Sequence, residues 1–75
     1  MPTAYLLLNT DIGREREVLQ KIKHVDGVQE AFSLWGLYDI IARVKADTMD
    51  KLAQIISQFQ ISNIHTKLTV IVTEA

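Results

Sequence analysis

The sequence predicts one α+β domain, residues 1–75, in which strands and helices follow the order β-α-β-β-α-β. Two observations lead to this order. In two segments the apolar residues recur at the spacing of a helix. In four others, apolar and polar residues alternate or the segment is apolar throughout, as in strands. A length of 75 residues suits a single domain near the small end of what folds alone.

The first half of the chain predicts a strand, a helix and a second strand. Residues 4–10 (AYLLLNT) are apolar on both faces, as expected of a central strand. Residues 14–25 carry valine, leucine and isoleucine at helical spacing, with glutamates in the first turn and lysines in the last, which complements the helix dipole. Gly27 is expected to follow the helix in the left-handed conformation, and residues 28–35 form the next strand.

A tight hairpin is predicted to join the second and third strands. Gly36 and Leu37 suit a two-residue turn of type II′, because that turn favours glycine at its first central position. Residues 38–46 then return as the third strand, with apolar side chains at alternate positions.

A second helix and a fourth strand complete the chain. Asp47 or Thr48 is expected to cap the helix, whose apolar side chains form a broad stripe that extends to Phe59. Residues 67–73 (KLTVIVT) are rich in β-branched side chains, which favours a strand.

These elements predict the ferredoxin-like, split βαβ arrangement. Right-handed crossovers place both helices on one face of a four-stranded antiparallel sheet, with the first and third strands in its centre. The other face is left uncovered, and either register of residues 4–8 puts apolar side chains on it. Because a bare apolar face is an association surface, the sequence predicts a dimer, formed face to face as in dimeric α+β barrels or through edge strands.

Composition excludes several classes of function. Eight basic and nine acidic residues leave a net charge of −1, which argues against nucleic acid or an acidic membrane bound through a broad basic face. The absence of cysteine excludes disulfides and thiolate chemistry and suits a reducing, cytoplasmic compartment. No segment has the signal-peptide pattern or the about 20 apolar residues that span a bilayer. A hydrophobic content of 48% in so short a chain favours self-association.

The sequence shows no constellation typical of catalysis, a metal site or an organic cofactor, so none of these is expected. His24 and His65 belong to different predicted elements and are interpreted as solvent-exposed or helix-capping side chains. The acidic residues are scattered, without the spacing of a metal site. The alternative function is a small dimeric α+β barrel enzyme of the cofactor-free oxygenase or isomerase type. Asn9 and His65 are the polar candidates for the buried pocket that such an enzyme requires.

The segment from Trp35 to Asp39 is the most informative part of the sequence. An indole, a glycine, a phenol and a carboxylate follow one another at a predicted turn at the end of the sheet. One interpretation is structural: Trp35 packs on a neighbouring subunit and Asp39 caps the turn. The other is a small polar pocket, in which Asp39 accepts hydrogen bonds from an ammonium group while backbone N–H groups around Gly36 face a carboxylate. Composition alone favours neither.

The string GLYDIIARV, preceded by a helix ending in DGV and a strand, resembles the effector-binding domain of the Lrp/AsnC family of feast/famine transcriptional regulators, also called the regulation-of-amino-acid-metabolism (RAM) domain. The likeness runs from AYLLLNT through GREREVLQKIKHVDGVQEAF and GLYDIIARVKA to KLTVIV, which is essentially the whole chain. Full-length members carry an N-terminal helix-turn-helix domain that reads DNA. The chain is similar to a stand-alone form of the effector module, without that domain.

The resemblance implies a mode of assembly and a ligand site. Such domains dimerise through their sheets, the dimers assemble into rings such as octamers, and amino acids bind at the contacts between dimers. Carried onto this chain, the hairpin lines the site and the start of the last strand faces it from a neighbouring subunit. The implied site residues are Trp35, Gly36, Leu37, Tyr38, Asp39, Thr66, Lys67, Leu68 and Thr69. Asp39 is expected to bind the ligand's amino group, and the turn backbone with the hydroxyl of Thr66 or Thr69 its carboxylate.

The leading hypothesis is therefore a non-enzymatic regulatory module that binds a small amino acid between subunits and so modulates oligomeric assembly. It would act by co-assembling with full-length Lrp/AsnC proteins, or as an adaptor for another protein. Trp35 departs from the smaller or polar residues often found at its position, and it either narrows the ligand pocket or fills it. If the indole fills the pocket, oligomerisation itself is the function, which is a scaffolding alternative.

Overall fold

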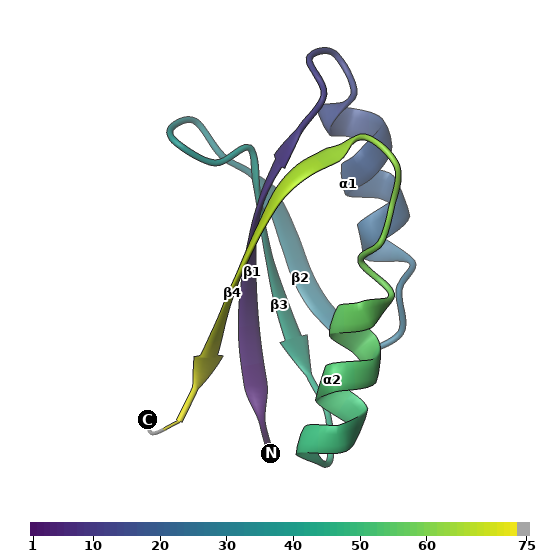
Figure 1. Cartoon of the computed structure of the whole chain (residues 1–75), viewed down its shortest axis with the longest axis vertical. Helices are drawn as coiled ribbons and strands as arrows, with labels where there is room; N and C mark the ends of the chain where they lie inside the picture. The colour runs from purple at the N-terminus through teal and green to yellow at the C-terminus, as the bar shows by residue number, and fades with distance from the viewer. Residues whose placement is uncertain (74–75) are drawn as a thin grey trace.

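A computed structural model describes residues 1–73, and the predicted domain extends two residues beyond this described part. The elements are, in chain order, β1 (Thr3–Thr10), α1 (Glu15–Lys23), β2 (Val28–Ser33), β3 (Ile40–Lys45), α2 (Met49–Ser57) and β4 (Ile64–Val72). The strands form one antiparallel sheet in the order β2-β3-β1-β4, and both helices lie on the same side of it (Figure 1). This confirms the ferredoxin-like arrangement with the first and third strands in the centre.

The core lies between the sheet and the helices. Alternate side chains of β1 and β3 point toward the helices and are buried, as the sequence predicted for a strand that is apolar on both faces. The fully buried side chains are Ala4, Leu6, Leu8, Val18, Ile22, Ile40, Ala42, Val44 and Leu52, with Phe59 from the α2–β4 connection almost as deeply buried. Burial of each large apolar side chain stabilises the fold by about 1.5–3 kcal/mol.

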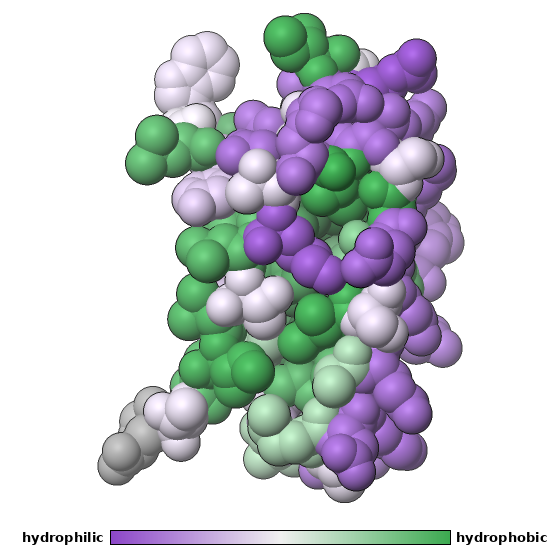
Figure 2. Space-filling view, in the orientation of Figure 1, coloured by the Kyte–Doolittle hydropathy of each residue, from purple (hydrophilic) through white to green (hydrophobic). Residues whose placement is uncertain are grey.

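The opposite side of the sheet is bare, and we call it the open face. The strand register aligns Tyr5 with Val70 and Leu7 with Leu68, so the remaining side chains of β1 share this side with those of β4. Its apolar members are Tyr5, Leu7, Phe32, Ile41, Leu68, Val70 and Val72. Figure 2 shows hydrophobic residues gathered along the side of the molecule away from the helices. The same face also carries an ion pair between β2 and β3, in which Arg43 Nε lies 3.3 Å from Glu30 Oε2.

The predicted two-residue hairpin is wrong. β2 ends at Ser33 and β3 begins at Ile40, so six residues, 34–39, form the connection. Gly36 is not among the glycines with positive φ, whereas a type II′ turn requires positive φ at this position. The loop is wider than a two-residue turn because Asp39 is hydrogen-bonded to β1. Its backbone N–H donates to the carbonyl of Leu8 at 2.9 Å.

Element ends also differ from the prediction. Both helices are shorter than expected, and Gly27 is left-handed at φ +96°, as predicted. β4 begins at Ile64, three residues before the predicted start, because the sheet register rather than hydrophobicity defines that end. Ile64 pairs with Thr10 of β1 across an irregularity in the register, in a segment too polar to have been recognised as a strand.

The N-cap of α2 gives a first prediction. Of the two residues expected to cap this helix, Thr48 does so: its hydroxyl accepts the backbone N–H of Lys51 at 3.1 Å. Thr48→Ala is therefore expected to lower the free energy of unfolding by about 1 kcal/mol, measured by urea denaturation. Asp47→Ala is the matched control, with an expected change within about 0.5 kcal/mol. Equal losses in the two variants would contradict this assignment of the cap.

Candidate functional site

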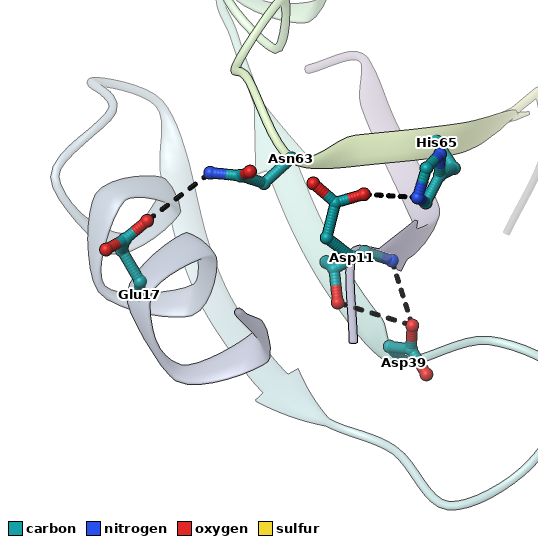
Figure 3. A network of polar contacts seen from close by, with 6 residues as sticks. Asp11, Glu17, Asp39, Asn63 and His65 are labelled. Carbon is teal, nitrogen blue, oxygen red and sulfur yellow. Dashed lines mark hydrogen bonds and ion pairs between the residues drawn. The ribbon is translucent and has the colours of Figure 1, made fainter. Parts of the chain in front are cut away.

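The candidate site is built around the anchored loop of residues 34–39. The carboxylate of Asp39 is fixed to β1, since its Oδ2 accepts the backbone N–H of Thr10 at 2.9 Å and the Thr10 hydroxyl at 3.4 Å. The loop is closed at its base, where the N–H of Leu34 donates to the carbonyl of Asp39 at 2.7 Å. These bonds hold the Gly-x-Tyr-Asp segment at one end of the sheet, and Figure 3 shows the two contacts made by the Asp39 carboxylate.

A surface depression of about 420 Å³ lies beside this loop. It is lined by Glu15, Ser33, Leu34, Trp35, Gly36 and Asp39. The volume is within the range of small-molecule sites. Three of the residues expected at the ligand site, Trp35, Gly36 and Asp39, are thus brought together. Leu37 and Tyr38 do not line the depression: Leu37 projects into solvent, and Tyr38 is half-buried beside it in the loop.

Glu15 is a lining residue that the sequence analysis missed. In the sequence it reads as an ordinary acidic residue in the first turn of a helix. The signal that could have found it is topological. In this fold the start of α1 and the β2–β3 loop lie at the same end of the sheet (Figure 1), so a first-turn side chain can reach the loop.

The depression is suited to a positively charged hydrogen-bond donor. Ionised carboxylates only accept hydrogen bonds, and two of them, from Glu15 and Asp39, border the same space. Oδ2 of Asp39 is committed to Thr10, whereas its Oδ1 accepts no hydrogen bond from residues 1–73. Asp39 therefore anchors the loop to β1 through Oδ2 and leaves Oδ1 as an available acceptor among the described residues.

The β4 residues lie at the same end of the sheet but across β1 from the loop. Thr66 pairs with Asn9 and Lys67 with Leu8, so two strand spacings, about 10 Å, separate them from Asp39. The register also places Thr66 and Leu68 on the open face, and Lys67 and Thr69 on the helix side. One copy of the chain therefore does not bring these four residues into the depression, and it presents the two threonine hydroxyls to opposite faces.

A second depression, of about 450 Å³, lies where the α2–β4 connection enters β4. It is lined by Phe59, Gln60, Ile61, Ser62, Ile64, His65 and Lys67. His65 forms an ion pair with Asp11, and Nζ of Lys67 lies 3.5 Å from the carbonyl of Ile56 (Figure 3 shows the His65 contact). The charged side chains of this second depression are basic, whereas those of the first are acidic.

The remaining polar candidates have structural positions. Nδ1 of His24 lies 2.8 Å from the carbonyl of Gln20, as expected of a helix-capping histidine. Asn9 lies on the open face opposite Thr66, and the His65 side chain is about two-thirds exposed. Within residues 1–73, no group of three histidine or acidic side chains is placed to hold a metal ion.

The sequence profile of the Lrp/AsnC ligand binding domain matches residues 3–75. The chain belongs to the Lrp/AsnC ligand-binding domain family. The match includes the anchored loop and both depressions, so the residues that build the candidate site all fall within the family's domain. A comparison with the curated proteins finds no match.

Solved structures share the fold along the whole domain. FFRP-DM1 is 36% identical, with a TM-score of 0.89 over 96% of this chain and 99% of that chain. The hypothetical protein PHS023 from Pyrococcus horikoshii is 35% identical, with a TM-score of 0.90 over 100% of this chain and 93% of its own. The transcriptional regulator NMB0573 from Neisseria meningitidis, solved in complex with L-Met, has the same fold at 14% identity and a TM-score of 0.77, and the match covers 97% of this chain and 50% of that one.

Membership of the Lrp/AsnC family makes this chain a regulatory, effector-binding domain. The sequence-based recognition is confirmed, and it depended on the Gly-x-Tyr-Asp loop and the order of elements. In the described part of the chain, neither helix has the length and hydropathy required to cross a membrane.

Proposed function

We propose that this Lrp/AsnC domain is a non-enzymatic sensor that binds a small amino acid in a site completed by two copies of the chain. The observation that supports this most is the anchoring of the loop by Asp39. One carboxylate oxygen holds the loop to Thr10, and the other remains available beside a depression of suitable size. Charge-assisted hydrogen bonds of this kind recognise an ammonium group well.

The division of donors and acceptors supports a shared site. An amino acid carries an ammonium group, which needs acceptors, and a carboxylate, which needs donors. Asp39 and Glu15 supply acceptors at the first depression. The β4 residues with donors, Thr66 and Lys67, lie about two strand spacings away in the same copy. A neighbouring copy that presents its β4 end to the loop would supply the missing half, together with Leu68 or Thr69.

The open face supports self-association. Its four strands span about 19 Å, and six paired residues extend about 20 Å, which gives a flat area of about 400 Å² before side-chain relief is counted. This area is that of the whole face, polar side chains included, and the exposed apolar side chains gathered on it favour an interaction site. We therefore infer that two copies pack through their open faces and that such dimers form larger rings, of which an octamer is one example.

The same surface suggests how the module would act on regulation. The chain spans about half the length of NMB0573, so the same domain occurs within longer regulators. Full-length Lrp/AsnC proteins in the cytoplasm that present a similar open face are the expected partners for co-assembly. If the module acts instead as an adaptor, the other protein is expected to bind to this same open face.

The enzyme alternative has less support from the structure. It needs a polar side chain in a pocket between the sheet and the helices. Asn9 faces the open side of the sheet, and His65 lies on the surface with Asp11. The space between the layers is occupied by buried side chains such as Leu6, Leu8 and Phe59.

Thermal unfolding with a panel of free amino acids tests the proposal. A ligand at about 100 times its Kd stabilises the folded state by about 2.7 kcal/mol per site, and in a domain of this size this raises Tm by roughly 10 °C or more. The N-acetylated form of the best amino acid is the control and should have no effect, because it lacks the ammonium group. No change in Tm with any of the twenty amino acids at millimolar concentration would refute amino-acid sensing.

A further inference from the structure

The loop between β2 and β3 presents two large apolar side chains to solvent. Trp35 is 103% exposed and Leu37 is 91% exposed, which leaves both without packing in a single copy. We call residues 34–37 the arm. In Figure 1 the loop that contains the arm projects away from the helices, toward the side of the open face. The arm therefore extends beyond the sheet in the direction from which a second copy would approach.

The arm stands on a fixed base. The N–H of Leu34 donates to the carbonyl of Asp39, and the N–H of Asp39 donates to the carbonyl of Leu8, at 2.7 and 2.9 Å. The side chain of Asp39 adds its bond to Thr10. Because both ends of the loop are hydrogen-bonded, the arm is held in its projecting position before any partner binds, which lowers the entropy lost on association.

We propose that the arm clasps a second copy of this chain across the open face, so that Trp35 and Leu37 become buried against the partner. This rests on the open-face assembly proposed above and adds a specific anchor to it. Tryptophan is among the side chains enriched at the binding hot spots of protein interfaces. An arm of this kind is a different use of Trp35 from filling a ligand pocket in its own subunit.

Continuity of the apolar surface points to a second copy as the occupant. Phe32, on the open face of β2, is 56% exposed, and Leu34 at the start of the arm is 39% exposed. Exposed apolar side chains therefore occur both at the end of β2 and at the start of the arm. A partner that covers the open face would meet the arm as part of the same surface.

The area required for a stable dimer points the same way. Specific interfaces bury about 800 Å² on each partner, and the flat projection of the open face is about 400 Å². The protruding side chains make the accessible area larger than this projection. Even so, the area that the sheet alone can bury stays near the lower limit for specific interfaces. A tryptophan buries about 150–250 Å² by itself, so the arm supplies a substantial part of the difference.

The arm also connects assembly to the ligand site. Trp35 and Gly36 line the depression that contains Asp39. Because a partner on the arm would contact a wall of the same depression, ligand binding and association are expected to be coupled, so that each strengthens the other.

The fluorescence of Trp35 tests the proposal without any substitution, because the chain contains a single tryptophan. The unmodified protein is diluted through its association range, with the species present at each concentration determined by sedimentation velocity. We expect the emission maximum to move to shorter wavelength, and acrylamide quenching to weaken, in step with formation of the dimer. If the indole in the dimer stays as accessible as in the monomer, the proposal for the arm is wrong, whereas the proposed open-face dimer is not contradicted. A shift that appears only in species larger than a dimer also overturns the arm as proposed, and a monomer at all concentrations overturns both proposals.

Substitutions supply the second test. Trp35→Ala and Leu37→Ala are each expected to weaken dimerisation by at least about tenfold without lowering Tm at concentrations where the protein is monomeric. Ile12→Ala is the matched control, because Ile12 is 100% exposed but lies in the β1–α1 turn, away from the open face. Its dimerisation should equal that of the unmodified chain. Unchanged dimerisation in both arm variants, or an equal loss in the control, would overturn the proposal.

Discussion

Val70→Asp is expected to convert the protein into a folded monomer. Val70 lies on the open face opposite Tyr5 and is 47% exposed in a single copy, so an aspartate there remains hydrated and costs the isolated fold little. Between two packed sheets the same carboxylate would be buried without a partner, at a cost of several kcal/mol. We therefore expect association to weaken more than a hundredfold, measured by sedimentation equilibrium.

Ile71→Asp is the control for this variant. Ile71 is the next residue of the same edge strand and is 40% exposed, but it points to the helix side of the sheet. The Ile71 variant should associate as the unmodified chain does, even if its stability is somewhat reduced. Val70→Asp protein that still dimerises with unchanged affinity would show that the open face is not the interface.

Asp39→Asn is expected to abolish most of the stabilisation by amino acids while preserving the loop. The asparagine carbonyl can still accept the N–H of Thr10, which anchors the loop at 2.9 Å in the native chain. The negative charge that would face the ligand's ammonium group is lost. A hydrogen bond to a charged group contributes about 1.5–3 kcal/mol, so the ligand's Kd should rise by roughly ten- to a hundredfold, measured by calorimetry.

Asp11→Asn is the matched control for the Asp39 variant. Asp11 lies at the same end of the sheet and pairs with His65, but it does not line the depression. Its substitution should leave the Kd for the amino acid within about twofold of the native value, which corresponds to about 0.4 kcal/mol. If Asp39→Asn binds the ligand as tightly as Asp11→Asn does, the ammonium group is held elsewhere.

The sequence was sufficient for those parts of the fold that follow from side-chain periodicity. The run of apolar residues in β1 predicted a central strand, and the structure divides it between the buried Leu6 and Leu8 and the open-face Tyr5 and Leu7. The crossover rule then placed both helices on one side. These features depend on local patterns and on the handedness of connections, which one sequence contains.

The β2–β3 connection could not be predicted in the same way. Gly36 and Leu37 have the local propensity of a tight turn, but the loop conformation is determined by a contact between Asp39 and Thr10, which are 29 positions apart. The start of β4 depends likewise on pairing of Ile64 with Thr10 rather than on its own pattern. Local propensity is a weak guide wherever such tertiary contacts decide.

The candidate site was predictable in part. The Gly-x-Tyr-Asp string identified the family and pointed to Asp39, and the structure places Asp39, Gly36 and Trp35 beside one depression. Glu15 was missed because its position near the loop arises only from the three-dimensional arrangement. The choice between Thr66 and Thr69 was left open, and the register now shows that they point to opposite faces.

Calorimetric titration of the monomeric Val70→Asp protein, with the amino acid that most stabilises the native chain, tests most directly whether the ligand site is shared between copies. If donors from a second copy are needed, the monomer should bind that amino acid at least a hundredfold more weakly than the native assembly does. Binding by the monomer with the native Kd would show that a single copy holds the complete site, and the proposed link between ligand and assembly would be wrong.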